Sequence, residues 1–218
     1  MKNKYVDFIS DEHFLDCVAK LHNAYLKAKN NISKKNFYTN KVDTIKLTFD
    51  AKFNDLDEES LIQAEILRQI DKSINNLIGT FHEQVLGGIK GFEIGNLSGY
   101  DIKAKDDTLF AVFKFDAISK IIEDCIFEKL SKDAQVFKKA KFYFVDFTTD
   151  ENKYEKWIIG NEEYKVSHKN VFKISIKNFY SLLCQNDYAL DNLLEKIPTV
   201  ILDFYENRHS KTLMSNKK

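Results

Sequence analysis

The stretch Gly95–Lys114, GNLSGYDIKAKDDTLFAVFK, decides how the rest of the chain is interpreted. Its apolar residues predict short strands joined by a polar turn at Asp106–Asp107. Asp101 lies on the first expected strand, and Lys114 ends the second. Metal-dependent hydrolysis of a phosphodiester needs a carboxylate that holds the cation and an ammonium that steadies the attacking water or the charged phosphorus centre. Asp101 and Lys114 are therefore the candidate catalytic pair.

A third group is expected two residues before the lysine, where an acid would complete such a site. This position is Val112. With a valine there, Mg²⁺ would have only the Asp101 carboxylate and backbone carbonyl oxygens. Mg²⁺ is often held by one or two carboxylates together with several waters, so a single carboxylate would bind it weakly.

The overall charge of the chain says nothing about its partners, because 33 Lys and Arg residues balance 33 Asp and Glu residues. The local charge is more informative. Cys17–Val42 holds six lysines and no acid, and Tyr164–Asn186 holds four lysines and no acid. Such runs are typical of an ordinary solvated surface. The more specific interpretation is that they form basic surfaces that bind a phosphate backbone.

The cysteines and the hydropathy pattern point to the cytoplasm. Cys17, Cys125 and Cys184 are far apart and odd in number, so we expect three buried free thiols in a reducing compartment. No apolar run reaches the ~18 residues of a membrane span, and the N-terminus lacks a signal-peptide core.

Hydrophobic periodicity predicts alternating helices and strands. Lys141–Phe147, KFYFVDF, is apolar on both faces, as is typical of a central strand covered by helices. We expect an α/β fold, a sandwich with a central mixed sheet flanked by helices. Expected helices cover residues 11–29, 57–86, 118–130, 177–184 and 188–197, with a last helix opened by Pro198. Expected strands cover residues 43–53, 92–94, 100–104, 109–115, 141–147, 157–159, 163–166 and 171–176.

Several short motifs resemble one family in the same order along the chain. They are Leu77–Gly87 (LIGTFHEQVLG), Gly91–Glu93 (GFE), Gly99–Ile102 (GYDI) and the strand that ends at Lys114. They resemble I-G-x-F-H-Q-x-I-L-G, G-W-E, V-D-L and A-E-V-K-N-K-Y-N-T of type II restriction endonucleases of the Eco47II group. The segment from Phe179 to Ile201 is also similar to the closing segment of that group.

The resemblance implies a PD-(D/E)xK nuclease fold, Mg²⁺ as cofactor, double-stranded DNA as substrate and cleavage at GGNCC-like sites. Asp101 and Lys114 match the motif of the group. Val112 replaces its catalytic glutamate, and Phe115–Ser119 replaces N-K-Y-N-T. The resemblance therefore supports the fold more strongly than the activity, and the GGNCC specificity is not assured.

Two glutamates are candidates for the missing carboxylate. Some enzymes of this fold resemble the pattern K-x13-E, which here runs from Lys114 to Glu128. Glu128 would then be a metal ligand together with Asp101. Glu123 is a second choice on the same expected helix. The alternative is Glu83, on the helix before the catalytic strands. His82 beside it is a candidate general base.

DNA contacts are expected from lysines on the basic runs, because lysines position a protein on phosphates without reading bases. The candidates are Lys34, Lys35, Lys165, Lys169 and Lys173. We expect one domain over residues 1–218, with a core at about residues 60–150. DNA-contacting and dimerisation elements would lie in residues 1–56 and 151–218.

Three hypotheses remain open at this stage. The first is a Mg²⁺-dependent type II restriction endonuclease, a homodimer that works with a cognate DNA methyltransferase. The second is a catalytically inactive nuclease-fold protein that binds DNA without cutting it. The third is an interaction protein that keeps only the scaffold.

Overall fold

The computed structural model describes residues 3–31, 43–95, 99–149, 152–160 and 164–215, with the main chain alone for residues 31 and 208–215. The chain forms two compact units. One comprises Met1–Cys17 with His82–Lys218, and the other is Val18–Phe81. The organisation as a single domain over residues 1–218 stays a prediction.

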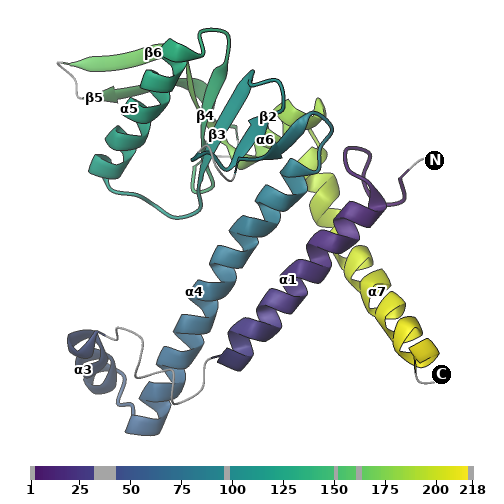
Figure 1. Cartoon of the computed structure of the whole chain (residues 1–218). Coiled ribbons are helices and arrows are strands. Elements are labelled where there is room, and N and C mark those ends of the chain that lie inside the picture. The colour runs from purple at the N-terminus through teal and green to yellow at the C-terminus, as the bar shows by residue number, and fades with distance from the viewer. Residues whose placement is uncertain (1–2, 32–42, 96–98, 150–151, 161–163, 216–218) are drawn as a thin grey trace. The chain divides into compact units, whose positions relative to one another are not determined.

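The larger unit contains a mixed sheet in the order β1-β2-β3-β4-β6-β5 (Figure 1). Strands β3, β4 and β6 are parallel neighbours, and the other pairings are antiparallel. The strands are β1 (Phe92–Ile94), β2 (Ile102–Ala104), β3 (Leu109–Lys114), β4 (Lys141–Asp146), β5 (Tyr154–Gly160) and β6 (Lys165–Ser175).

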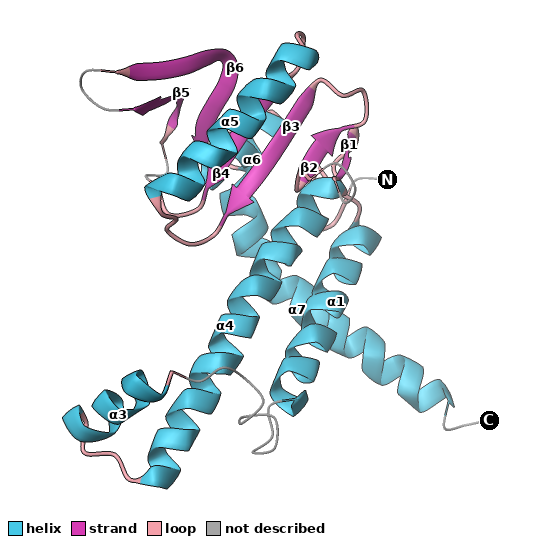
Figure 2. Cartoon of the chain, turned by 60° about the vertical axis from the view of Figure 1, so that its left-hand side comes forward, coloured by secondary structure: helices cyan, strands magenta, loops and turns pink. Residues whose placement is uncertain are grey.

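Strand β4 is the centre of this sheet, as its sequence predicts. All of its residues except Lys141 are buried. Helices α5 (Lys120–Val136) and α6 (Ile176–Cys184) lie on opposite faces of the sheet, as Figure 2 shows. Each begins at a serine N-cap, Ser119 and Ser175, whose hydroxyl accepts a backbone N–H of the first turn. The expected α/β fold with helices on both faces of a mixed sheet is confirmed.

Aromatic side chains fill both interfaces between sheet and helices. On the α5 side, Phe144 stacks on Trp157 with ring centroids 4.4 Å apart, and Phe127 of α5 meets the same indole edge-on at 5.4 Å. On the α6 side, Phe113 of β3 meets Phe179 at 5.7 Å. Large rings of this kind each bury extensive apolar surface between the layers.

Helices α1 (Asp11–Asn31) and α4 (Glu58–Gly87) each cross the boundary between the two units. Helix α4 ends at Gly87, as the Gly87–Gly88 pair predicts. A Cβ atom on Gly88 would lie 2.2 Å from the His13 ring, and one on Gly87 would lie 2.7 Å from the Ile94 side chain. Glycine at these positions therefore lets α1 and β1 approach the end of α4 closely.

The prediction of a strand at residues 43–53 is wrong. This segment is helix α3 (Thr44–Phe53), in the smaller unit. The Asp43 carboxylate accepts the N–H groups of Ile45 and Lys46 at 3.0 and 3.1 Å, which is an N-cap. The apolar residues Ile45, Phe49 and Phe53 recur every four residues, so the helical period competes with the alternating pattern that predicted a strand.

The expectation that Pro198 opens a last helix is also wrong. Pro198 does not open a helix but lies inside α7 (Ala189–Ser215), where the buried Leu193 and Val200 hold the helix on both sides of it. On α5, Ile121 and Ile122 are exposed, whereas Phe127, Leu130 and Ala134 make the buried face.

Among the described residues none of the cysteines forms a disulfide. Cys17 is buried, Cys184 is partly buried and Cys125 is exposed, so the expectation of three buried thiols is wrong for Cys125. Within the same residues, no helix combines the length and the apolarity that crossing a membrane requires.

Replacing Phe142 by alanine tests the aromatic core. Its side chain is fully buried and stacks on Phe110 at 5.0 Å. We expect Phe142→Ala to lower the free energy of unfolding by roughly 3–5 kcal/mol, measured by urea denaturation. Phe53→Ala removes a ring that is 79% exposed and should cost under about 1 kcal/mol. Equal losses in the two variants would contradict the placement of the core.

Candidate active site at the end of β3

Asp101 is fixed to β3 by main-chain groups. Its carboxylate accepts the N–H of Phe113 at 2.6 Å, and its own N–H donates to the Ala111 carbonyl at 2.9 Å. Its carbonyl accepts the N–H of Gly95 at 3.1 Å. Because Phe113 directly precedes Lys114, the carboxylate of Asp101 lies against the strand one residue from the candidate lysine. The structure therefore brings the two residues of the candidate pair to the same end of β3.

Val112 fills the position where the resemblance expects an acid, and it belongs to the hydrophobic core. Its side chain is 8% exposed and lies in the same cluster as Phe110, Phe127 and Leu130. An apolar side chain is the residue type that suits this environment. Any second carboxylate for the site has to come from another element.

Glu83 of α4 provides a carboxylate near Asp101. Burial first, and the negative charge of Asp101 second, raise the pKa of Glu83 from 4.5 to about 7. A carboxyl group that is desolvated beside a like charge resists ionisation, and a cation between the two would offset the repulsion. The sequence offered Glu83 as one alternative for the second carboxylate, and in the structure it lies close enough to Asp101 to be affected by its charge.

His82, the neighbour of Glu83, contacts aromatic side chains instead. Its ring lies 5.2 Å from that of Phe147 and 5.9 Å from that of Tyr180, and its Nδ1 is 3.0 Å from the Tyr180 hydroxyl. Burial lowers the pKa of His82 to about 4, so the imidazole is neutral at physiological pH. These contacts make His82 a packing residue of the larger unit.

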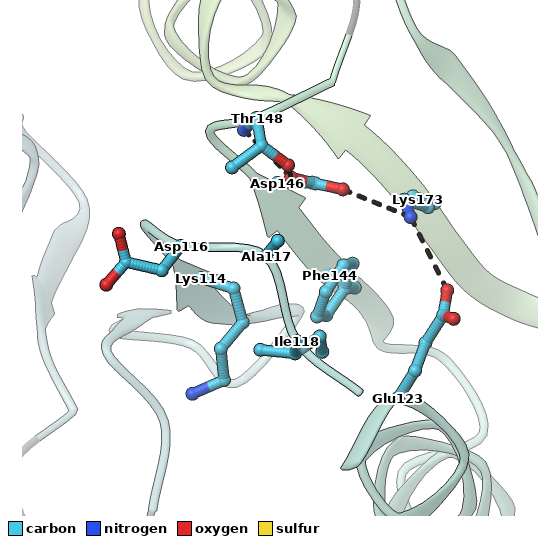
Figure 3. A pocket seen from close by; sticks show the side chains of 9 residues that line it. All are labelled: Lys114, Asp116, Ala117, Ile118, Glu123, Phe144, Asp146, Thr148 and Lys173. Atoms are coloured by element: carbon cyan, nitrogen blue, oxygen red, sulfur yellow. Dashed lines mark hydrogen bonds and ion pairs between the residues drawn. The ribbon is translucent and has the colours of Figure 1, made fainter. Parts of the chain in front are cut away.

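A pocket of about 150 Å³ lies beside Lys114, at the carboxyl ends of the parallel strands (Figure 3). Lys114 and Asp146 are register partners on β3 and β4, and both line the pocket. The other lining residues are Asp116, Ala117, Ile118, Glu123, Phe144, Thr148 and Lys173. Ligands of open α/β sheets commonly bind at such strand ends.

One wall of this pocket is an ion-pair bridge. The Lys173 ammonium is 3.1 Å from Asp146 and 3.4 Å from Glu123. Thr148 donates its N–H and its hydroxyl to Asp146 at 2.9 and 2.8 Å. Burial would raise the pKa of Asp146, but the bonds from Thr148 and Lys173 outweigh it and hold that pKa below its usual value. Figure 3 shows the Lys114 ammonium pointing away from this bridge.

The remaining candidates lie in different environments. Glu128 is on an exposed face of α5 with its carboxylate 3.9 Å from Lys132, and its side chain is 66% exposed. Lys165 and Lys169 are exposed on β6, whereas Lys173 is held by the bridge. Lys34 and Lys35 lie outside the described residues.

Asp146 and Thr148 were missed by the sequence reasoning. The signal available was an acid at the end of the central strand followed by a threonine two residues later, which is a frequent local hydrogen-bonding pattern. Across the described part of the chain, no group of three or more His, Cys, Asp or Glu side chains is arranged to hold a metal ion.

The pKa of Glu83 predicts how stability changes with pH. A raised carboxyl pKa means that the folded state binds more protons than the unfolded state between pH 4.5 and about 7, so stability falls as pH rises through this window. Glu83→Gln removes this loss. Between pH 5 and pH 8, the variant should gain roughly 1–3 kcal/mol relative to the unmodified protein in urea denaturation.

Glu128→Gln is the matched control, because it makes the same chemical change on an exposed part of α5. Its stability difference should stay the same at both pH values. A pH-independent difference for Glu83→Gln would show that Glu83 is not held near the Asp101 charge.

Comparison with known proteins identifies relatives over almost the whole chain. A family model described as "Eco47II restriction endonuclease" matches residues 6–206. The type II restriction enzyme Sau96I of Staphylococcus aureus is 31% identical over 222 residues, which covers 97% of this chain and 85% of that enzyme. The type II restriction enzyme Eco47II of Escherichia coli is 32% identical over 94 residues, 43% of this chain and 38% of that enzyme.

Proposed function

Because the chain belongs to the Eco47II restriction endonuclease family, we propose that it is a type II endonuclease that hydrolyses double-stranded DNA with Mg²⁺. A cytoplasmic location, a homodimeric state and a cognate DNA methyltransferase in the same system belong to the same proposal. Two observations support the proposed chemistry: the charge of Asp101 acts on Glu83, and the Asp101 carboxylate accepts the N–H of Phe113, the residue directly before Lys114.

The two carboxylates fit a magnesium ion. Mg²⁺ prefers oxygen ligands and is often bound by one or two carboxylates, with waters in the remaining positions. Burial first, and the Asp101 charge second, raise the pKa of Glu83 to about 7, so a cation there would relieve the repulsion between the two carboxylates. Asp101 and Glu83 would hold the ion, and the ion would supply Lewis-acid activation of the phosphate and of its bound water.

The side chains of this chain have separate roles in the proposed reaction. Water adds to phosphorus while one P–O bond to a sugar breaks, so negative charge grows on the phosphoryl oxygens. Lys114 would place its ammonium beside this charge and steady the attacking water. The bond from Phe113 would hold Asp101 in place during the reaction. Since Val112 is in the core, Glu83 takes the role of the second carboxylate.

DNA would be held along exposed basic residues of β6. Lys165 and Lys169 are exposed there and suit contacts with phosphates. Lys34 and Lys35 remain candidates from the sequence alone. The Lys173 ammonium is engaged by Asp146 and Glu123, which favours a structural role for this lysine over a phosphate contact.

One observation favours a second candidate function. The acid position of the resemblance holds a buried valine, so the chain is alternatively a nuclease-fold protein that binds duplex DNA without cutting it. Incubating the protein with phage DNA of mixed sequence and Mg²⁺ separates the two. Discrete fragments support the endonuclease, whereas a gel shift in Ca²⁺ without fragments supports the binding protein.

Asp101→Asn and Glu83→Gln test the site itself. Each removes one negative charge from the proposed cation position, so each should slow cleavage by roughly 100-fold or more. Calorimetric titration with Mn²⁺ should show weaker binding in both variants, and this readout does not depend on cleavage. DNA binding in Ca²⁺ should be largely retained.

Glu128→Gln is again the matched control and should cleave DNA and bind Mn²⁺ as the unmodified protein does. Loss of cleavage in Glu128→Gln together with full activity in Glu83→Gln would transfer the second carboxylate to α5 and overturn this assignment.

A further inference from the structure

The Lys173 ammonium lies between two carboxylates at the ends of the strands. It is 3.1 Å from Asp146 of β4 and 3.4 Å from Glu123 of α5. The three side chains are 21%, 12% and 24% exposed, so water screens their charges only in part. Glu123 is also 3.7 Å from the exposed Lys120, whereas Asp146 has no ion-pair partner other than Lys173 within the described residues. Asp146 therefore depends on Lys173 for the balance of its charge.

Asp146 lies beside Lys114 on the neighbouring strand. The two residues are register partners in the parallel pair β3–β4. Val112 and Phe144, two residues earlier on each strand, both belong to the core cluster that includes Phe127 of α5. Because side chains two residues apart point to the same face of a sheet, Lys114 and Asp146 share that face, on strands about 5 Å apart. Lysine has a flexible four-carbon stem, which is long enough to cross this gap.

Lys114 nevertheless does not pair with Asp146. Figure 3 shows its ammonium pointing away from the bridge, and within the described residues it forms no ion pair. The Lys173 ammonium contacts the Oδ2 atom of Asp146, and Thr148 donates its N–H and its hydroxyl to Oδ1 at 2.9 and 2.8 Å. Both oxygens of this carboxylate are thus occupied. A second ammonium at Asp146 would have to approach Lys173, which carries the same charge.

We propose that Lys173 is a positioning residue, which keeps the Lys114 ammonium out of this ion-pair bridge and available to the phosphate. This inference rests on the proposed function, in which Lys114 steadies the attacking water. Without the charge of Lys173, the Asp146 carboxylate would attract Lys114, and an ammonium held at β4 would be lost to the reaction. Lys173 therefore acts through Lys114 and needs no contact with DNA.

Lys173→Met tests the proposal, because it removes the charge and keeps an unbranched apolar stem beside the Phe144 ring, whose centroid lies 5.2 Å from the Lys173 ammonium. Acetylation of Lys114 by acetic anhydride, measured by mass spectrometry without metal or DNA, reports whether its ammonium is paired. An ion pair raises the pKa of a lysine and lowers the fraction of reactive amine. Lys114 should therefore be acetylated at least roughly threefold more slowly in the variant.

Adding Asp146→Asn separates positioning from a merely structural role of the bridge. Asparagine keeps a carbonyl oxygen for the two bonds from Thr148 but lacks the charge that would attract Lys114. In the double variant the bridge is still absent, yet Lys114 should be acetylated at the rate of the unmodified protein. Single-turnover cleavage with Mg²⁺ should be slower by roughly tenfold or more in Lys173→Met and restored in the double variant, with DNA binding in Ca²⁺ unchanged.

Lys103→Met is the matched control. Lys103 also lies between two carboxylates, 3.3 Å from Glu93 and 2.8 Å from Asp107, and its side chain is 23% exposed. It belongs to β2, where its register partners are Glu93 and Phe110 and not Lys114. The control makes the same chemical change in a similar ion-pair bridge, so it should leave the acetylation of Lys114 unchanged.

Three outcomes would overturn the proposal. The first is acetylation of Lys114 in Lys173→Met at the unmodified rate or faster. The second is slow acetylation that persists in the double variant, and the third is undiminished cleavage by Lys173→Met when the unmodified protein cuts DNA. Circular dichroism checks that each variant is folded, and Lys173→Gln replaces Lys173→Met if the latter does not fold. Because acetylation needs no cleavage, a protein that is labelled as expected but does not cut DNA counts against the proposed function alone.

Discussion

The bond between the Phe113 N–H and the Asp101 carboxylate is the interaction on which the candidate site depends. It joins the loop before β2 to the end of β3, where Lys114 follows directly. The separation of the two groups is therefore set by main-chain geometry and by the antiparallel pairing of β2 with β3. A site fixed in this way holds its groups in position before any ligand binds, which is the condition for strong electrostatic catalysis.

Two acidic pairs lie near the end of β3, and they differ in whether a nearby lysine balances their negative charge. Asp146 and Glu123 share the Lys173 ammonium, and the pKa of Asp146 is lowered despite its burial. Asp101 and Glu83 behave in the opposite way, because the pKa of Glu83 is raised. The second pair would gain more from a divalent cation, since a cation there replaces repulsion by attraction. This contrast supports placing the metal at Asp101 and not in the neighbouring pocket.

The sequence predicted those parts of the fold that depend on local pattern. The apolar run of β4 indicated a central strand, and the Gly87–Gly88 pair indicated the end of α4. The prediction of a strand at residues 43–53 failed because the apolar residues there fit both a strand and a helix. The N-cap at Asp43 favours the helix.

The parts of the site that the sequence could not predict depend on distant contacts. Lys173 reaches Asp146 only because β6 pairs with β4, and the direction of Glu83 depends on how α4 meets the sheet. The spacing of residues along the sequence does not reveal either of these long-range contacts.

Val112 links the candidate site to the packing of the hydrophobic core. Its side chain now contributes to the contact between β3 and α5, beside Phe127 and Leu130. An acidic side chain at position 112 would place a charge in this apolar environment and weaken the packing of α5 on the sheet. The residue type at position 112 is therefore constrained by the packing of β3 against α5 and not only by the chemistry of the candidate site.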